Sequence, residues 1–563
     1  MPVFSRKHWI AVAALLIVAA SFRVSVAHWL PNDAPDDGRV YEQMARNVLE
    51  QHVYSHDPEP PYAPSLIRLP GYPLFLAAIY SVFGHGNNGA VRIVQARVDT
   101  ATCVLIALLA FFWQPDQKKK LASALAALAL TAVCPFTTIY SATILTEVPT
   151  NFLLMALLVA ATLAFKASST TEDTEENKKR KLRTAILWCV AGLIGGLAVM
   201  MRPDSGLYLA AVGVTLVISG LRTLIFGLGK TPKTKEQRPK TAIGRSLIAA
   251  TIFSLAFVLV LTPWTIRNWR VFHLFQPLAP AHAEMPGEFV PRGYLLWVRT
   301  WLDKDSYVAQ FLWPLDIKPI HVDDLPPGAF DSPEEKNRVA ALFDKYNNAD
   351  NSDAAPEGET QTKPSQSATP TLSLKGEQNE EDNSDQSENS AESASVEMTP
   401  EIDAGFAQIA RERIARHPFR YYVWLPLKRA RTMWFDTHSQ YWPFEGALLP
   451  LDDLDYEHHQ QIWLPLFAGL TALYTLLGLA GGWVLWRARK LEARQWLLLA
   501  ALAIGFRVAL FSFLENPEPR YFVEFFPILS VLGGIAIANT LNRLTTPQQI
   551  QTDRKVQSFH SDP

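Results

Sequence analysis

The chain has 563 residues, of which 49% are hydrophobic, and its formal net charge at pH 7 is −2. Such a near-neutral chain carries no overall basic charge that would indicate a nucleic-acid partner. The hydrophobic residues are gathered in stretches of about 20 residues, the length of a membrane-spanning helix, and this distribution excludes a soluble protein.

Ten apolar stretches predict an all-α polytopic membrane protein with about ten transmembrane helices. They lie near residues 9–30, 92–113, 121–141, 146–166, 184–201, 205–227, 246–264, 462–486, 495–514 and 523–541. For the first stretch, the alternative is a signal peptide cleaved after Ser25-Val26-Ala27. The stretch continues through Trp29-Leu30, which favours a retained span.

Basic residues are concentrated in the connections on one side of the predicted membrane. The clusters fall within residues 118–120, 178–181, 230–245 and 487–494. Because cytoplasmic connections are enriched in lysine and arginine, both termini are expected in the cytoplasm. The connections 31–91, 142–146, 202–204, 265–461 and 515–522 are then outside. The Ala/Leu-rich spans indicate a bacterial inner membrane.

The first outer connection, residues 31–91, has the pattern of a folded structure. Helical spacing over 36–51, with a face of mixed apolar and charged residues, predicts an interfacial helix. A second helix is expected over 74–83, after the Arg68-Leu69-Pro70-Gly71-Tyr72-Pro73 turn.

The long connection 265–461 contains an acidic tract at 346–400 with almost no large apolar residues, which predicts a disordered insertion. A helix is expected over 401–416, packed on a neighbour rather than lying on the membrane. We therefore divide the chain into a catalytic membrane module (1–345), the insertion, the remaining helices (401–545) and a cytoplasmic tail (546–563).

Ionisable residues gather at the predicted outer ends of the spans. Charges at the hydrocarbon boundary are costly unless paired or solvated, so their convergence on one face indicates a site. Carboxylates can act as general bases, and arginine suits phosphate oxygens. The residues are Asp33, Asp36, Asp37, Glu147, Arg202, Asp204, Arg267, Glu515, Glu518 and Arg520.

Each of these residues also has a structural alternative. An aspartate such as Asp33 or Asp36 can cap the interfacial helix, and for any one aspartate capping is favoured over catalysis. Glu147 suits the first turn of a helix because of the helix dipole. Each arginine alone can anchor a span at the lipid headgroups.

A metal site has little support in the sequence. The outer histidines His52, His56, His458 and His459 lack an accompanying carboxylate pattern and are interpreted as surface residues. The three cysteines, Cys103, Cys134 and Cys189, lie within predicted spans, so no disulfide is expected outside. We expect no cofactor, with a divalent metal as the alternative.

Motifs spread over most of the chain resemble the polyprenyl-phosphate-dependent GT-C membrane glycosyltransferases. This superfamily includes protein mannosyltransferases, the lipid A aminoarabinose transferase and the galacturonic acid transferases of lipopolysaccharide core. The motifs are Asp37-x-x-x-Tyr41-x-x-x-Ala45-x-Asn47, Arg68-x-Pro-Gly-Tyr72-Pro, Phe83-Gly84, Val91-Arg92, Thr146-Glu147, Arg202-Pro203, Pro263-Trp264-x-x-Arg267-Asn268, His417-Pro418 and Pro519-Arg520-Tyr521. Their shared order carries the resemblance, because each motif alone is weak.

The resemblance implies a GT-C-type bundle whose first outer loop carries interfacial helices. It also implies an inverting transferase that moves a hexosyl or pentosyl group from polyprenyl phosphate to a hydroxyl on the outer face. The acceptor is a glycan, a lipid or a protein. The catalytic base falls best on Asp37, with Asp36 and Asp33 as runners-up.

The resemblance assigns supporting roles to further residues. Glu147 matches a second acidic position that orients the acceptor or the base. Arg68 is expected to neutralise the leaving phosphate, helped by Arg267 and Arg520. Tyr41, Tyr72, Arg202 and Tyr521 are the expected substrate-binding residues.

Two functions from other classes compete with a transferase. A lipid or solute transporter or flippase would place ionisable residues near the bilayer midplane. Arg23, Arg97, Asp99 and Arg507 lie within apolar stretches, and Arg507 suits a carrier best. A non-catalytic scaffold is opposed only by the set of Asp37, Glu147 and Arg68.

Overall fold

The computed structural model describes residues 5–30, 36–169, 176–227, 239–348, 396–435 and 458–545, and these residues form helices and no strand. The chain divides into two compact units. The first, here called the bundle, comprises Met1–Glu288, Trp434–Leu510 and Pro519–Pro563. The second, here called the insert unit, comprises Phe289–Met433 and Phe511–Glu518.

The bundle confirms the prediction of an all-helical polytopic membrane protein, because the predicted stretches fall on its helices, with 121–141 divided between α5 and the short helices that follow it. Among the described residues, eight helices are long and apolar enough to cross a membrane, or up to nine if the bent pair Gln117–Ala132 and Pro135–Ala142 is one span. The last stretch forms the shorter apolar helix Phe525–Leu541. The helices that carry the predicted stretches are α1 (Arg6–Trp29), α4 (Asn88–Trp113), α5 (Lys120–Ala132), α7 (Glu147–Ser169), α8 (Glu176–Met201), α9 (Gly206–Gly227), α10 (Pro239–Phe272), α16 (His458–Arg487), α17 (Leu491–Ser512) and α18 (Phe525–Thr545).

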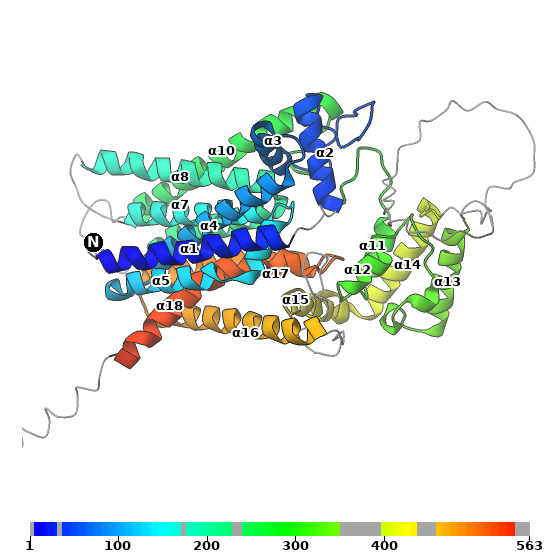
Figure 1. Ribbon diagram of the computed structural model, residues 1–563. Coiled ribbons are helices and arrows are strands. Elements are labelled where there is room, and N and C mark those ends of the chain that lie inside the picture. Colours follow the sequence, from blue (N-terminus) through cyan, green and yellow to red (C-terminus); the bar gives the residue numbers. More distant parts are fainter. Residues whose placement is uncertain are drawn as a thin grey trace, which may run out of the picture. The chain divides into compact units, whose positions relative to one another are not determined.

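Successive helices run in alternating directions, so the bundle has two ends of different character (Figure 1). The basic end carries the start of α1 and the lysine-rich connection before α5. The opposite end carries α2 (Asp36–Glu50) and α3 (Gly71–Phe83), the two helices expected in the first outer connection. We call it the α2–α3 end.

Close helix packing in the bundle depends on glycine. At Gly481 of α16, a Cβ atom would overlap the backbone of Leu532 in α18. At Gly534 of α18, a Cβ atom would overlap Ala127 of α5. Small residues let helix backbones approach closely, and within a membrane such packing is a main source of helix association.

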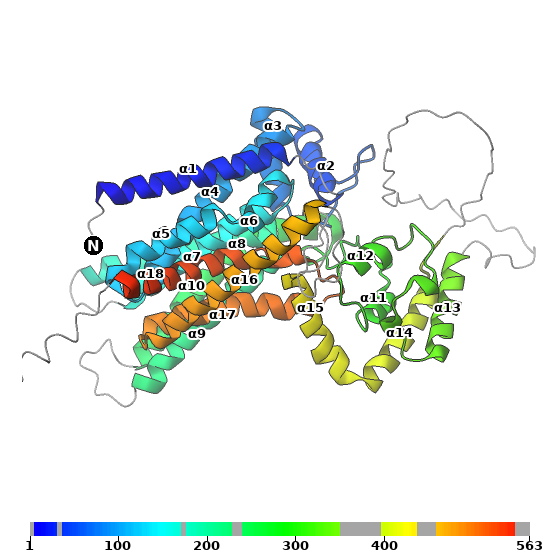
Figure 2. The same cartoon turned by 60° about the horizontal axis from the view of Figure 1, so that its bottom comes forward.

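The insert unit is a small helical assembly (Figure 2). It has an aromatic core of its own. Its main helices are α11 (Arg292–Val298), α12 (Ser306–Phe311), α13 (Pro333–Asn347) and α14 (Pro400–Arg416). The predicted helix over 401–416 is α14, and it packs against α11 and α13, as expected. Phe406 of α14 is fully buried with a ring centroid 5.0 Å from that of Trp297.

Residues 349–395, most of the predicted acidic insertion, lie outside the described residues. Its two flanks are close together, because the Glu397 amide donates a hydrogen bond to the Tyr346 carbonyl (3.4 Å). The insertion therefore leaves the insert unit after α13 and returns to it just before α14.

Candidate active site

Three residues from distant parts of the chain meet at the α2–α3 end of the bundle. Asp37 lies in the first turn of α2, Arg68 precedes α3, and Arg520 lies in a 3₁₀ turn, Pro519–Phe522, before α18. The Asp37 carboxylate accepts hydrogen bonds from Arg68 (Nη2 to Oδ1, 2.8 Å) and Arg520 (Nη1 to Oδ2, 3.3 Å). We call these three residues the Asp37 cluster. Their side chains are 28%, 26% and 13% exposed, so a ligand can reach them.

The Asp37 carboxylate is charged at neutral pH. Burial alone would raise the pKa of Asp37, but the guanidinium groups of Arg520 and Arg68 outweigh burial and hold this pKa below its ordinary value. Burial and the nearby Asp37 charge also raise the pKa of Tyr41 to about 12. The Tyr41 phenol therefore stays protonated and can donate a hydrogen bond.

Arg267 braces the loop that carries Arg68. Its guanidinium donates hydrogen bonds to the carbonyls of Ser65 (2.7 Å) and Tyr54 (3.3 Å). The Tyr54 hydroxyl in turn donates to the Arg68 carbonyl (3.1 Å). The described contacts of Arg267 are thus with this loop, with the neighbouring Asn268 side chain and with aromatic rings such as Trp264, rather than with the Asp37 carboxylate.

Gly71 allows the turn after Arg68 to approach the end of α8. A Cβ atom on Gly71 would overlap the backbone of Met200 and Met201. Only glycine fits this contact, which brings the Arg68 turn beside Arg202, the residue that follows α8.

We expect Gly71→Ala to destabilise the bundle by about 1–3 kcal/mol, because the added methyl group must push α3 away from α8. The control is Gly89→Ala, where the new methyl group would meet its nearest atom at an ordinary 3.5 Å. Thermal unfolding of the purified protein in detergent measures both effects. Equal unfolding temperatures for the two variants would contradict the close packing at Gly71.

A second group of charges, the Glu147 cluster, lies at the same end of the bundle. Glu147 begins α7, and Arg202 donates to Glu147 Oε1 (2.9 Å) and Asp204 Oδ1 (3.2 Å). Arg202 also lies 3.2 Å from Glu524 Oε1. Arg507 of α17 pairs with Asp204 and, at 3.0 Å, with Glu524. The cluster thus joins the ends of α7, α8, α9, α17 and α18.

The Glu147 cluster is largely sealed from solvent. Glu524 and Arg507 are fully buried, and Glu147 is 2% exposed. Two arginines face three carboxylates, so the cluster has one formal negative charge in excess. Glu147 Oε2 is buried without a hydrogen-bond partner in the described structure.

We expect Arg507→Leu to lower the free energy of unfolding by about 3–5 kcal/mol, because it leaves buried carboxylates without their counter-charge. The control is Arg97→Leu, which removes an exposed arginine from α4. Thermal unfolding in detergent compares the variants. An Arg507→Leu protein as stable as the control would show that the buried pairs do not support the bundle.

Tyr521 connects the two clusters. The guanidinium of Arg520, from the Asp37 cluster, lies 5.4 Å from the Tyr521 ring centre, and that of Arg202, from the Glu147 cluster, lies 5.9 Å away. The charges of both Asp37 and Glu147 also act on the Tyr41 phenol. The two clusters are therefore neighbouring parts of one charged site.

The other residues expected at the site are placed as follows. Asp33 lies outside the described residues, and Asp36 begins α2 but its side chain is outside the described part. Tyr72 is fully buried, packs edge-on against Tyr41 with 5.1 Å between ring centres, and donates to Gln95 (2.9 Å). Tyr72 thus belongs to the buried core and packs against the Tyr41 ring.

Glu515 and Glu518 belong to the insert unit rather than to the bundle. Glu515 pairs with Arg299 (2.7 Å) in that unit. The sequence missed Glu524, which completes the Glu147 cluster. Its position directly before the apolar helix α18 was the sequence signal that could have identified it.

The described residues contain no group of three or more His, Cys, Asp or Glu side chains that could hold a metal ion. Among the outer histidines, His56 lies 4.0 Å from Asp57. His458 and His459 begin α16, with side chains outside the described part.

No family model matches the chain, and no curated protein matches it in sequence. Among solved structures it is similar to the archaeal oligosaccharyltransferase AglB from Archaeoglobus fulgidus in complex with an inhibitory peptide and a dolichol-phosphate. That alignment has 12% identity and a TM-score of 0.45, and covers 99% of this chain and 53% of AglB. A second similar structure is ArnT from Cupriavidus metallidurans bound to undecaprenyl phosphate, at 12% identity and a TM-score of 0.34, covering 95% of this chain and 79% of ArnT.

Each of these two structures holds a polyprenyl phosphate, which is dolichol-phosphate in AglB and undecaprenyl phosphate in ArnT. The chain spans about half the length of the oligosaccharyltransferase. Which reaction this chain performs depends on its own charged site.

Proposed function

We propose that the chain is an inverting glycosyltransferase that moves a sugar from a polyprenyl-phosphate carrier to a hydroxyl acceptor. The observation that carries this proposal is the Asp37 carboxylate held between Arg68 and Arg520. A transferase of this kind needs a base for the acceptor and positive charge for the leaving phosphate. The Asp37 cluster supplies both groups side by side.

The two arginines connect donor binding to the strength of the base. In the free protein they hold the pKa of Asp37 low, which makes it a weak proton acceptor. Guanidinium groups form strong paired hydrogen bonds with phosphate oxygens. When Arg68 and Arg520 form hydrogen bonds with the donor phosphate, they stabilise the Asp37 carboxylate less. The pKa of Asp37 therefore rises. Asp37 thus becomes a stronger base once the donor is bound.

The reaction then follows from the charges of the cluster. Asp37 takes the proton of the acceptor hydroxyl as its oxygen attacks the anomeric carbon, and the carbon–oxygen bond to phosphate breaks. The polyprenyl phosphate leaves with the electron pair of that bond, and Arg68 and Arg520 stabilise its negative charge. In this scheme Glu147, Arg202 and Tyr521 position the acceptor or Asp37, and Tyr41 donates to a substrate oxygen. No metal or other cofactor is part of the proposal.

We further propose that the site faces the periplasm of a bacterial inner membrane, with both termini in the cytoplasm. The basic clusters within 118–120, 178–181 and 487–494 support this orientation, because they lie at the end of the bundle opposite to α2 and α3. The lipid tail of the donor would lie among the spans, and the acceptor would be a glycan, a lipid or a protein.

A transporter is the second candidate function. It can be assessed from whether the charged residues within the spans are paired with protein partners. Arg23 and Asp99 form a buried ion pair (2.7 Å), and Arg507 is paired with Asp204 and Glu524. Charges that are already neutralised by protein partners leave less for a transported ion to bind. This observation favours the transferase.

Membranes that contain the protein and are supplied with radiolabelled polyprenyl-phosphate sugars test the proposal. Label transferred to a lipid, glycan or protein fraction, and absent from membranes without the protein, supports a transferase. Movement of an unmodified lipid or solute across reconstituted vesicles, with no transfer from any donor, supports the transporter instead.

A further inference from the structure

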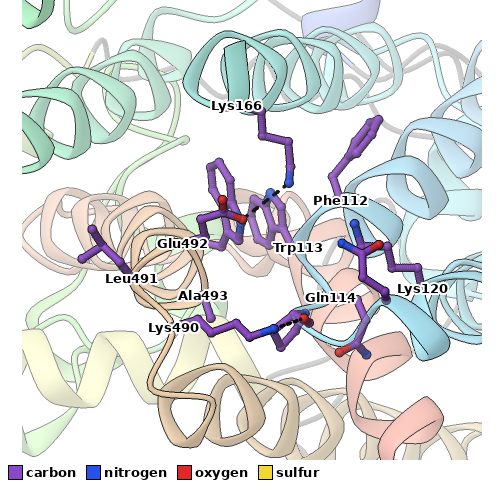
Figure 3. Close-up of a pocket in the computed structure, with 12 residues that line it drawn as sticks. Phe112, Trp113, Gln114, Lys120, Lys166, Lys490, Leu491, Glu492 and Ala493 are labelled. Carbon is purple, nitrogen blue, oxygen red and sulfur yellow. Dashed lines mark hydrogen bonds and ion pairs between the residues drawn. The ribbon is translucent and has the colours of Figure 1, made fainter. Parts of the chain in front are cut away.

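A cavity of about 440 Å³ opens at the basic end of the bundle. Figure 3 shows the side chains that line it. Three lysines line it, and each comes from a different part of the bundle. Lys120 begins α5, Lys166 lies in the last turn of α7, and Lys490 precedes α17. Glu147 and Lys166 lie 19 residues apart on α7, so about 28 Å of helix separates the two ends.

The cavity has an aromatic lining beneath its lysines. Trp113 and Trp496 line it and are stacked, with ring centres 6.0 Å apart and planes at 2°. Both side chains are almost fully buried, and the Trp113 indole donates to Thr162 (3.0 Å). Lys166 lies 6.0 Å from the Trp496 ring centre. The lining is therefore held in place by the bundle.

Positive charge exceeds negative charge around the cavity. The only acidic residue among those that line it is Glu492, which lies 3.7 Å from Lys166. Lys490 donates to the Pro115 carbonyl (2.7 Å), and Lys120 forms no ion pair with a described residue. Three lysines against one carboxylate leave two formal positive charges.

Enrichment of lysine at the cytoplasmic ends of spans accounts for exposed lysines such as Lys118, Lys178 and Lys179. It does not account for a cavity with a rigid aromatic lining. Cavities that hold small ligands measure about 300–1,000 Å³ and combine apolar walls with a few charged groups. Lysine ammonium groups bind phosphate as point charges.

We propose that this basic cavity binds a phosphate group, carried by an anionic lipid headgroup or free in solution. The depth of the lysines favours the lipid, because they lie at the ends of membrane spans, where headgroups meet the hydrocarbon. The lipid phosphate would contact Lys120, Lys166 and Lys490, and its glycerol and upper chain would cover Trp113 and Trp496. This site is separate from the proposed transferase site.

The test uses the full-length protein in detergent with phosphatidylglycerol, phosphatidylcholine or inorganic phosphate. The cavity variant carries Lys120→Gln, Lys166→Gln and Lys490→Gln. The control variant carries Lys118→Gln, Lys178→Gln and Lys179→Gln, which make the same change of charge with exposed lysines at the same end. Native mass spectrometry measures the bound lipid, and thermal unfolding measures stabilisation by inorganic phosphate.

We expect the wild type and the control variant to retain phosphatidylglycerol over phosphatidylcholine, and the cavity variant to bind it about a hundredfold more weakly. A response to inorganic phosphate alone, lost in the cavity variant, would assign the site to free phosphate. Equal phosphatidylglycerol binding by the two variants would overturn the proposal. So would a wild type that does not prefer phosphatidylglycerol over the zwitterionic phosphatidylcholine and does not respond to inorganic phosphate. If the cavity variant does not fold, Lys120→Gln alone is expected to weaken binding about fivefold.

Discussion

Asp37→Asn is expected to reduce sugar transfer by about 10²- to 10⁴-fold, the range that a positioned general base contributes. The asparagine side chain keeps the size of the aspartate but cannot take the proton of the acceptor hydroxyl. Its effect on stability is expected to be small, because partly exposed ion pairs contribute little to folding. Transfer in membranes from a radiolabelled polyprenyl-phosphate sugar, normalised to the amount of protein, measures the loss.

The matched control for this experiment is Glu59→Gln, which neutralises an exposed acid in the same outer connection. It should transfer at the wild-type rate. If Asp37→Asn also keeps that rate, Asp37 is not the base, and Asp36→Asn and Asp33→Asn are the next variants to measure. The outcome therefore separates the catalytic aspartate from one that only caps α2.

The helices of the bundle could be predicted because their signal is local. An apolar stretch of span length and a basic connection can each be recognised within about 20 residues of sequence. The two helices of the first outer connection had equally local signals, in their helical spacing and in the proline–glycine turn. By contrast, only α14 of the insert unit was predicted. Its helices α11 and α12 are short, and α11, α12 and α13 all pack into an aromatic core that they share with α14.

The charged site could be predicted only in part, because its contacts join residues far apart in the chain. Asp37 and Arg520 are 483 positions apart, and no spacing rule brings them together. Their shared place at the outer ends of spans was the useful signal. Glu515 and Glu518 lie between α17 and α18, as predicted, but the sequence does not show that this segment belongs to the insert unit up to Glu518.

The buried partners show a further limit of prediction from sequence. Arg507 lies within an apolar stretch and suited a carrier when considered alone. In the structure it pairs with Asp204, which lies 303 positions away in the turn between α8 and α9, and with Glu524, which directly precedes α18. The function suggested by a charge in a span therefore depends on whether a partner lies beside it.

Arg68→Ala and Arg520→Ala are each expected to lower sugar transfer by about 10²- to 10³-fold. This is the usual loss when an enzyme is deprived of one group that stabilises charge in the transition state. Arg68→Lys should recover part of the loss, because lysine keeps the charge but not the paired hydrogen bonds of the guanidinium. Arg46→Ala, which removes an exposed arginine from α2, is the control and should be fully active.

The pH dependence separates this role from a purely structural one. Because Arg520 and Arg68 hold the pKa of Asp37 low, removing either arginine raises that pKa towards its ordinary value. Transfer needs the deprotonated carboxylate, so the acidic limb of the activity profile should move to higher pH in both variants. Since the arginines share one carboxylate and one phosphate, the double variant should lose less than the product of the two single losses. Wild-type transfer by both single variants, with an unchanged acidic limb, would remove the arginines from the reaction.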